Sequence, residues 1–171
     1  MILKKSKNSS EGENNGELLW NSYKEKLYNF VRQWEWAFQD KSFCDSYYKK
    51  QWALIRHPAH LCEKWTIGFW TNSYPWEVIT YEEAVRRKKE AIDARDNRIT
   101  TDCLTDNQRI AMVDFIYQYS SYYANRMVQY GNSCNPQGAY NFIVAHRDHY
   151  KAKWHSWMVK REQLRINLFN Q

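Results

Sequence analysis

The sequence is poor in glycine and proline, with five Gly and three Pro among 171 residues. Because these residues mark the turns of all-β folds, their scarcity favours helices with short connections. No apolar run approaches the roughly 18 residues of a membrane-spanning helix, so stable membrane insertion is not expected. The basic residues within positions 1–7 are not followed by an apolar segment, so no signal peptide is predicted.

Cysteine is also scarce, and its spacing is uninformative for metal binding. None of the four residues Cys44, Cys62, Cys103 and Cys134 forms a CxxC pair, which excludes the usual structural zinc site. Their number is too low for a disulfide-rich scaffold, so free buried thiols are expected, with a Cys44–Cys62 disulfide as the alternative. No histidine pair has an evident third ligand. We therefore expect no metal and no cofactor.

No block of five like charges occurs, although Lys and Arg number 25 against 19 Asp and Glu, a net charge of +6. A dedicated nucleic-acid arm is thus unsupported, and no nucleic-acid partner is expected. A modest positive charge favours anionic partners such as a bacterial envelope. The run from Arg86 to Lys89 is interpreted as a solvated helix face. The histidines His146, His149 and His155 are interpreted as solvated or groove-lining.

Aromatic residues are abundant, at 17% of the chain. Tyr and Trp have flat faces and polar tips, which suit carbohydrate binding as well as core packing. The length fits one domain with a real core. Residues 1–16 contain almost nothing to bury and are predicted to be a disordered tail. Residues 17–171 are predicted to form a single domain.

Hydrophobic periodicity predicts where the helices lie. Between residues 17 and 38, apolar side chains recur at steps of three and four, the pattern of one helix. Thr80 with Glu83, and Thr105 with Gln108, are capping-box patterns that begin two further helices. The helix after Thr105 is the most hydrophobic and is expected to be central. Further helices are predicted at about 121–130, 136–145 and 155–169.

Strands are predicted between the first and second helices. One is expected near Phe43–Tyr48, and another at Lys64–Thr71, followed by a turn at 72–75. The fold class is therefore α+β, with a small β-hairpin lobe, a larger helical lobe and a cleft between them. Glu35 lies between Trp34 and Trp36, whose rings would desolvate its carboxyl group and raise its pKa. Glu35 is therefore a candidate general acid at the junction of the lobes.

Five segments, in order, resemble the bacteriophage-type lysozyme (endolysin) family of muramidases. The family's first helix ends in a catalytic Glu followed by Gly; here Glu35 is followed by Trp36. Its strand motif Trp-Thr-Ile-Gly-Tyr-Gly-His-Thr is similar to residues 65–71, although Trp70 replaces the second Gly and the His is absent. Residues 79–84 resemble its Ile-Thr-x-x-x-Ala helix start, and 104–113 its Leu-Thr-x-Asn-Gln-x-x-Ala-Leu-Val helix. Residues 157–162 resemble the start of its closing Gly-Leu-x-x-Arg-Arg-x-x-Glu helix.

The resemblance implies a lysozyme-like fold and hydrolysis of the β-1,4 bond between N-acetylmuramic acid and N-acetylglucosamine in peptidoglycan. Glu35 then corresponds to the acid, and Thr66 to a residue that positions water. The family's Asp follows its Glu by nine residues; here Cys44 stands nine residues after Glu35, and Asp45 stands ten after. Asp45 is preferred because a carboxylate can activate water, with Cys44 as the alternative. About fifteen extra residues precede Thr66, an insertion at about 46–62.

Two other functions stay open. One is a non-catalytic, lysozyme-like protein of a virion that binds glycan without cutting it, and the other is a lytic transglycosylase. For the leading hypothesis the partner is bacterial peptidoglycan, and the protein is expected to be a monomer, with virion association as an alternative. The expected location is the host cytoplasm with release to the periplasm and cell wall, or the virion.

Overall fold

The computed structural model describes residues 11–34, 39–44, 65–68, 71–73 and 77–171. These residues form six helices and three short strands. In chain order they are α1 (Glu11–Arg32), β1 (Gln39–Cys44), β2 (Trp65–Gly68), β3 (Thr71–Ser73), α3 (Tyr81–Asp96), α4 (Asp106–Gln118), α5 (Ser121–Asn132), α6 (Pro136–Ala152) and α7 (Ser156–Phe169). The expected helices, one at the start of the chain and five from residue 81 on, are confirmed.

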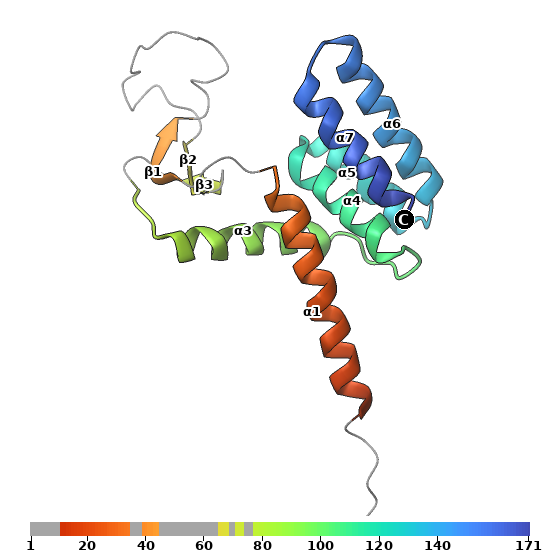
Figure 1. The fold of residues 1–171 in the computed structure, drawn as a ribbon, viewed down its shortest axis with the longest axis horizontal. Coiled ribbons are helices and arrows are strands. Elements are labelled where there is room, and N and C mark those ends of the chain that lie inside the picture. Colours follow the sequence, from red (N-terminus) through yellow and green to blue (C-terminus); the bar gives the residue numbers. More distant parts are fainter. Residues whose placement is uncertain (1–10, 35–38, 45–64, 69–70, 74–76) are drawn as a thin grey trace, which may run out of the picture.

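Helix α1 begins at Glu11, before the expected start at Glu17, and ends at Arg32, before the expected end at Phe38. Its predicted apolar stripe is buried at Tyr23, Leu27 and Val31. The N-terminal part projects away from the rest of the molecule, whereas the C-terminal part passes close to α3 and α4 (Figure 1). Packing against α3 and α4 therefore holds the C-terminal part of this helix.

The three strands form one antiparallel sheet in the order β1-β2-β3. The strand predicted at Phe43–Tyr48 instead covers Gln39–Cys44, and residues 45–48 lie outside the described part. The single strand predicted at Lys64–Thr71 is two strands that pair with each other, and β3 occupies part of the predicted turn. Two short strands have the same alternation as one long strand, so the pattern could not separate them.

Helix α3 begins at its predicted cap, where the backbone N–H of Glu83 donates to the Thr80 hydroxyl. Both β2 and β3 contact this helix. At its other end, the fully buried Asp96 accepts from Tyr23 and Lys24 of α1 and from Arg109 of α4. One carboxylate thus ties three helices together.

Helix α4 is the centre of the core, as the sequence predicts. Every residue from Ile110 to Ile116 is buried, and the helix contacts α1, α3, α5 and α7. Its capping box is complete, because the Thr105 hydroxyl accepts from the Gln108 N–H and the Gln108 side chain accepts from the Thr105 N–H. The mostly helical part of the expected architecture is confirmed.

A disulfide joins Cys103, before α4, to Cys134, after α5. The prediction of free thiols is therefore wrong for this pair. The two residues are 31 positions apart, a closure that stabilises the fold by about 3–4 kcal/mol on chain entropy alone. Spacing could not reveal the pair, since contact between two distant cysteines depends on how α4 and α5 pack.

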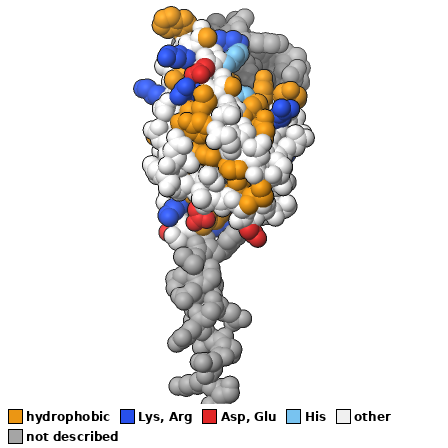
Figure 2. Space-filling view, turned by 90° about the vertical axis from the view of Figure 1, so that its right-hand side faces the viewer, with side chains coloured by type: hydrophobic (Ala, Val, Ile, Leu, Met, Phe, Trp, Pro, Cys, Tyr) orange, Lys and Arg blue, Asp and Glu red, His pale blue; other side chains and the backbone are white. Residues whose placement is uncertain are grey.

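Among the side chains that the structure describes, most large hydrophobic ones are buried or partly buried, but a few on the helical side are exposed. Figure 2 shows hydrophobic groups on this side, including the upper tip where α6 turns into α7. The most exposed is Trp154, at 93%, followed by Tyr122 and Val78. Within the described residues, no helix is both long and apolar enough to cross a bilayer.

Candidate functional site

The structure describes only some of the predicted catalytic residues. Glu35 and Asp45 lie outside the described residues. Thr66 lies in β2 and Cys44 in β1, on neighbouring strands. In the register of these strands, Thr66 pairs with Phe43, and Cys44 pairs with Trp65. The pairing of the two strands therefore brings Thr66 within one position of Cys44, the alternative to Asp45.

Trp34, the residue immediately before Glu35, contacts the helical core. The backbone N–H of Trp34 donates to the Val31 carbonyl at the end of α1, and the indole is partly buried. The guanidinium of Arg161, on α7, lies 5.7 Å from the centre of the Trp34 ring. Such a cation–π contact is attractive, and more so away from water. The contact connects the residue next to the candidate acid with the helical core.

Arg161 is itself held by a buried ionic network. Its guanidinium donates to both oxygens of Asp114, at 2.5 and 3.1 Å. Arg165 donates to Asp114 at 2.7 Å and also binds Glu162. The Glu162 carboxylate accepts from the Tyr119 hydroxyl. Two cations and two carboxylates balance, as buried charges require.

The network sets the protonation of its members. Burial alone raises the pKa of Asp114, but the guanidiniums of Arg165 and Arg161 outweigh it and hold that pKa below its ordinary value. Burial, together with the charge of Glu162, raises the pKa of Tyr119. Asp114 is therefore a fixed anion at neutral pH and Tyr119 a neutral donor. Neither group is suited to take up or release protons near pH 7.

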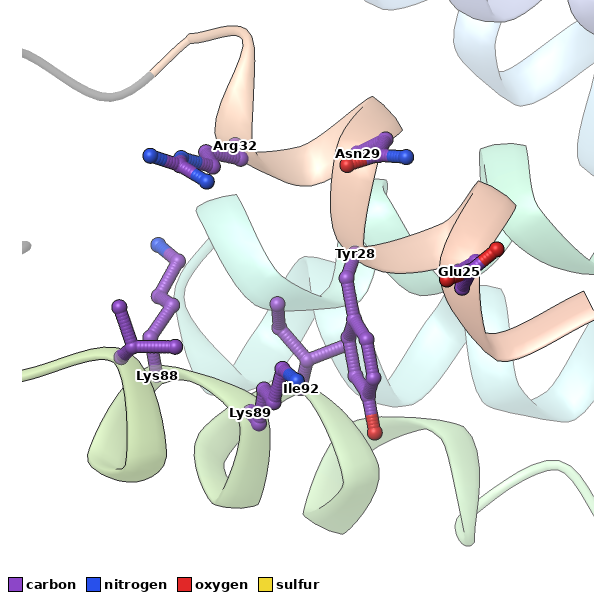
Figure 3. A pocket seen from close by; sticks show the side chains of 8 residues that line it. Glu25, Tyr28, Asn29, Arg32, Lys88, Lys89 and Ile92 are labelled. Carbon is purple, nitrogen blue, oxygen red and sulfur yellow. The ribbon is translucent and has the colours of Figure 1, made fainter. Parts of the chain in front are cut away.

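A pocket of about 210 Å³ lies between α1 and α3. Figure 3 shows Arg32 and Lys88 facing each other across it from the two helices. Its other lining residues are Glu25, Tyr28, Asn29, Val85, Lys89 and Ile92. Arg32 also donates to the Tyr81 hydroxyl at the start of α3. The pocket is therefore positively charged, and its α1 wall ends at Arg32, three residues before Glu35 in the sequence.

Lys88 corrects the interpretation of Arg86–Lys89 as a solvated face. Its side chain is buried, and its ammonium donates to the Tyr117 hydroxyl at 2.7 Å. Arg87 pairs with the buried Glu77, whereas Arg86 is exposed and bonds to Glu83 and Glu90. A run of four cations spans more than half a helical turn, so part of it must face the core side of the helix.

His146 was expected to be solvated or groove-lining, and the structure places it inside an aromatic cluster instead. Its ring lies 4.6–5.2 Å from the rings of Phe115, Tyr119, Tyr123 and Phe142. Burial lowers the pKa of His146 below its usual value. The other two histidines, His149 and His155, are exposed as predicted. The described residues contain no group of three side chains able to hold a metal ion.

Comparison with known proteins gives a fold. No family model matches the sequence, and no curated protein matches it. Among solved structures, the muramidase domain of SpmX from Asticaccaulis excentricus matches with a TM-score of 0.53 at 15% identity, over 85% of this chain and 95% of that one. This is a lysozyme-like fold.

A second solved structure supports the same conclusion. The endolysin from Escherichia coli O157:H7 phage FAHEc1 matches with a TM-score of 0.50 at 13% identity, over 86% of this chain and 89% of that one. The lysozyme-like fold thus extends over most of the chain, and the resemblance read from five short motifs is confirmed at the level of the fold. At such low identity, the catalytic residues have to be argued from this chain alone.

Proposed function

We propose that this chain is a peptidoglycan hydrolase that cleaves the β-1,4 bond between N-acetylmuramic acid and N-acetylglucosamine. The observation that carries the proposal is the lysozyme-like fold shared with a muramidase domain and an endolysin. The Glu35 motif and the Trp65–Gly68 strand stand at the expected places in the order of elements. The β-region and the helical part would form the two walls of the substrate cleft.

In this proposal Glu35 protonates the leaving glycosidic oxygen. A general acid for this step must be protonated near neutral pH, which requires a raised pKa. Trp34 supports that role, because its ring is partly buried and its indole nitrogen is shielded from water. The Trp34 ring thus provides an apolar neighbour for Glu35 in the chain.

Asp45 is proposed as the second carboxylate, with Thr66 positioning the water. Alternate positions of a strand belong to one face of a sheet. Thr66 pairs with Phe43, and Asp45 stands two positions after Phe43 in the sequence. Cys44 pairs with Trp65, so it does not share the alternating strand positions of Phe43 and Thr66. The register therefore favours Asp45 over Cys44.

The location follows from the same proposal. Disulfides persist in oxidising compartments, and the Cys103–Cys134 bond fits a protein that works in the periplasm or outside the cell. Release from the host cytoplasm to the cell wall, or carriage on a virion, would both bring it there.

The test is clearing of purified cell walls by the wild type and by Glu35→Gln, followed as loss of turbidity. Removing a general acid is expected to slow clearing by about 100-fold or more. Glu82→Gln is the matched control, since Glu82 is exposed on the first turn of α3. Asp45→Asn is expected to be slow and Cys44→Ser active. Equal clearing by Glu35→Gln and wild type would contradict the assignment.

The products separate this function from its alternatives. Reducing ends on the released muropeptides identify a hydrolase, and anhydro ends identify a lytic transglycosylase. Sedimentation of the protein with insoluble peptidoglycan without release of any soluble fragment identifies a glycan-binding protein. Three features favour this last alternative: Trp36 in place of the family's Gly, Trp70 in the strand motif, and the insertion at about 46–62.

A further inference from the structure

The turn between α6 and α7 holds a tryptophan in an unusual conformation. Trp154 has a φ of 58°, in the left-handed region that bulky residues rarely adopt. The N–H of His155 donates to the Tyr150 carbonyl, and the N–H of Trp154 to the Lys151 carbonyl, so the turn is closed by backbone hydrogen bonds. Glycine is the residue usually found where a helix ends in this way.

Beyond these hydrogen bonds, no side-chain packing of Trp154 within the described molecule offsets the strain. Trp154 is 93% exposed, and every residue from 151 to 157 is exposed. Trp157, on the first turn of α7, is 56% exposed. Strained residues are typically kept where a function needs them. A second exposed indole close to the first indicates a contact surface rather than an isolated exposed side chain.

The charges around the two indoles indicate the kind of partner. Lys151, Lys153 and Lys160 are all exposed. The only acidic residue from 147 to 160 is Asp148, which pairs with Arg147 at 2.8 Å. Figure 2 shows hydrophobic side chains beside Lys and Arg at this upper tip, which is convex. Exposed tryptophans surrounded by lysines match the interface of an anionic lipid bilayer.

We propose that the tip formed by residues 151–160 binds the surface of anionic lipid bilayers. The indoles enter the headgroup region, and the lysines contact the lipid phosphates. A glycan strand fits less well, because the tip is convex and offers no groove in which sugar hydroxyls could be bound. The tip would hold the protein at a membrane surface, and it acts independently of the proposed hydrolase site.

Sedimentation with phosphatidylglycerol vesicles and with phosphatidylcholine vesicles tests the proposal. The wild type is expected to bind the anionic vesicles, more weakly at high salt. Lys151→Glu with Lys153→Glu is expected to weaken binding by at least about tenfold, since each lysine near such a surface contributes about fivefold. Lys26→Glu with Arg126→Glu is the matched control, because both residues are exposed on other helices and the net charge changes equally.

Trp154→Gly separates binding from folding. Glycine relieves the left-handed backbone, so this variant is expected to unfold at a higher denaturant concentration than the wild type. Its binding to the anionic vesicles is expected to fall by about tenfold or more. Unchanged vesicle binding by Trp154→Gly would overturn the proposal, and so would absence of wild-type binding. Loss of binding to purified peptidoglycan with vesicle binding intact would instead assign the tip to glycan.

Discussion

At the scale of single residues, the buried network of Asp114, Arg161, Glu162 and Arg165 distinguishes this chain. The closing helix motif of the bacteriophage-type lysozyme family, which residues 157–162 resemble, contains Arg-Arg-x-x-Glu. In this chain the same positions are Arg161-Glu162-x-x-Arg165. The two opposite charges have exchanged places within α7. The exchange is possible because Arg165 reaches both Glu162 and Asp114, so every buried charge keeps a partner.

Asp114→Ala is expected to lower the free energy of unfolding by about 3–5 kcal/mol, because it leaves two buried guanidiniums without their carboxylate. Urea unfolding followed by circular dichroism measures the change. Asp148→Ala is the control: that carboxylate also pairs with an arginine, but its side chain is 58% exposed, so a loss below about 1 kcal/mol is expected. Equal losses for the two variants would show that the network is not a source of stability.

His146 makes stability depend on pH. Burial lowers its folded-state pKa below the usual 6.5, so the unfolded chain takes up a proton that the folded protein does not. The free energy of unfolding is thus expected to fall as the pH drops from 6.5 towards the lowered pKa. His146→Phe keeps a ring in the cluster and should flatten this slope in urea titrations at several pH values. The exposed His149→Gln should retain the slope, and an unchanged slope in His146→Phe would refute the assignment.

At the scale of elements, the helix caps could be predicted from the sequence, because the two residues of each capping bond lie three positions apart. Thr105→Ala removes the hydroxyl that accepts from Gln108 and is expected to cost about 1 kcal/mol of unfolding free energy. Ser120→Ala is the matched control, because Ser120 is also an N-cap but makes no side-chain capping bond. A chemical denaturation series on both variants checks the difference. A Ser120→Ala loss as large as that of Thr105→Ala would contradict this reading of the caps.

Structural features that depend on neighbours distant in the sequence could not be predicted from the sequence. The helices α3 to α7 followed from apolar periodicity and caps, which are local signals. The extent of β1 did not, since Gln39-Asp40-Lys41-Ser42 has little strand propensity and is ordered by pairing with β2. The Cys103–Cys134 bond, the burial of Lys88 and the contact between Arg161 and Trp34 each join two elements that only the fold brings together.

At the scale of the whole molecule, α1 consists of two parts with different environments. Its C-terminal part is buried through Tyr23, Leu27 and Val31 and is tied to α3 by Lys24. Its N-terminal part projects from the body of the molecule (Figure 1). The helix itself begins at Glu11, so the domain boundary near residue 17 stays a prediction.

Deletion of residues 1–16 tests this boundary. The truncated protein is expected to keep the wild-type free energy of unfolding within about 0.5 kcal/mol, because the removed residues precede Tyr23, the first buried residue among the α1 side chains that the structure describes. Leu27→Ala in the full chain is the contrasting variant, since Leu27 is fully buried and its truncation should cost about 2–5 kcal/mol. Urea unfolding of both proteins gives the two values. A loss above about 1 kcal/mol on deletion would mean that the projecting half of α1 has a partner in the fold, and the domain would then begin near Glu11.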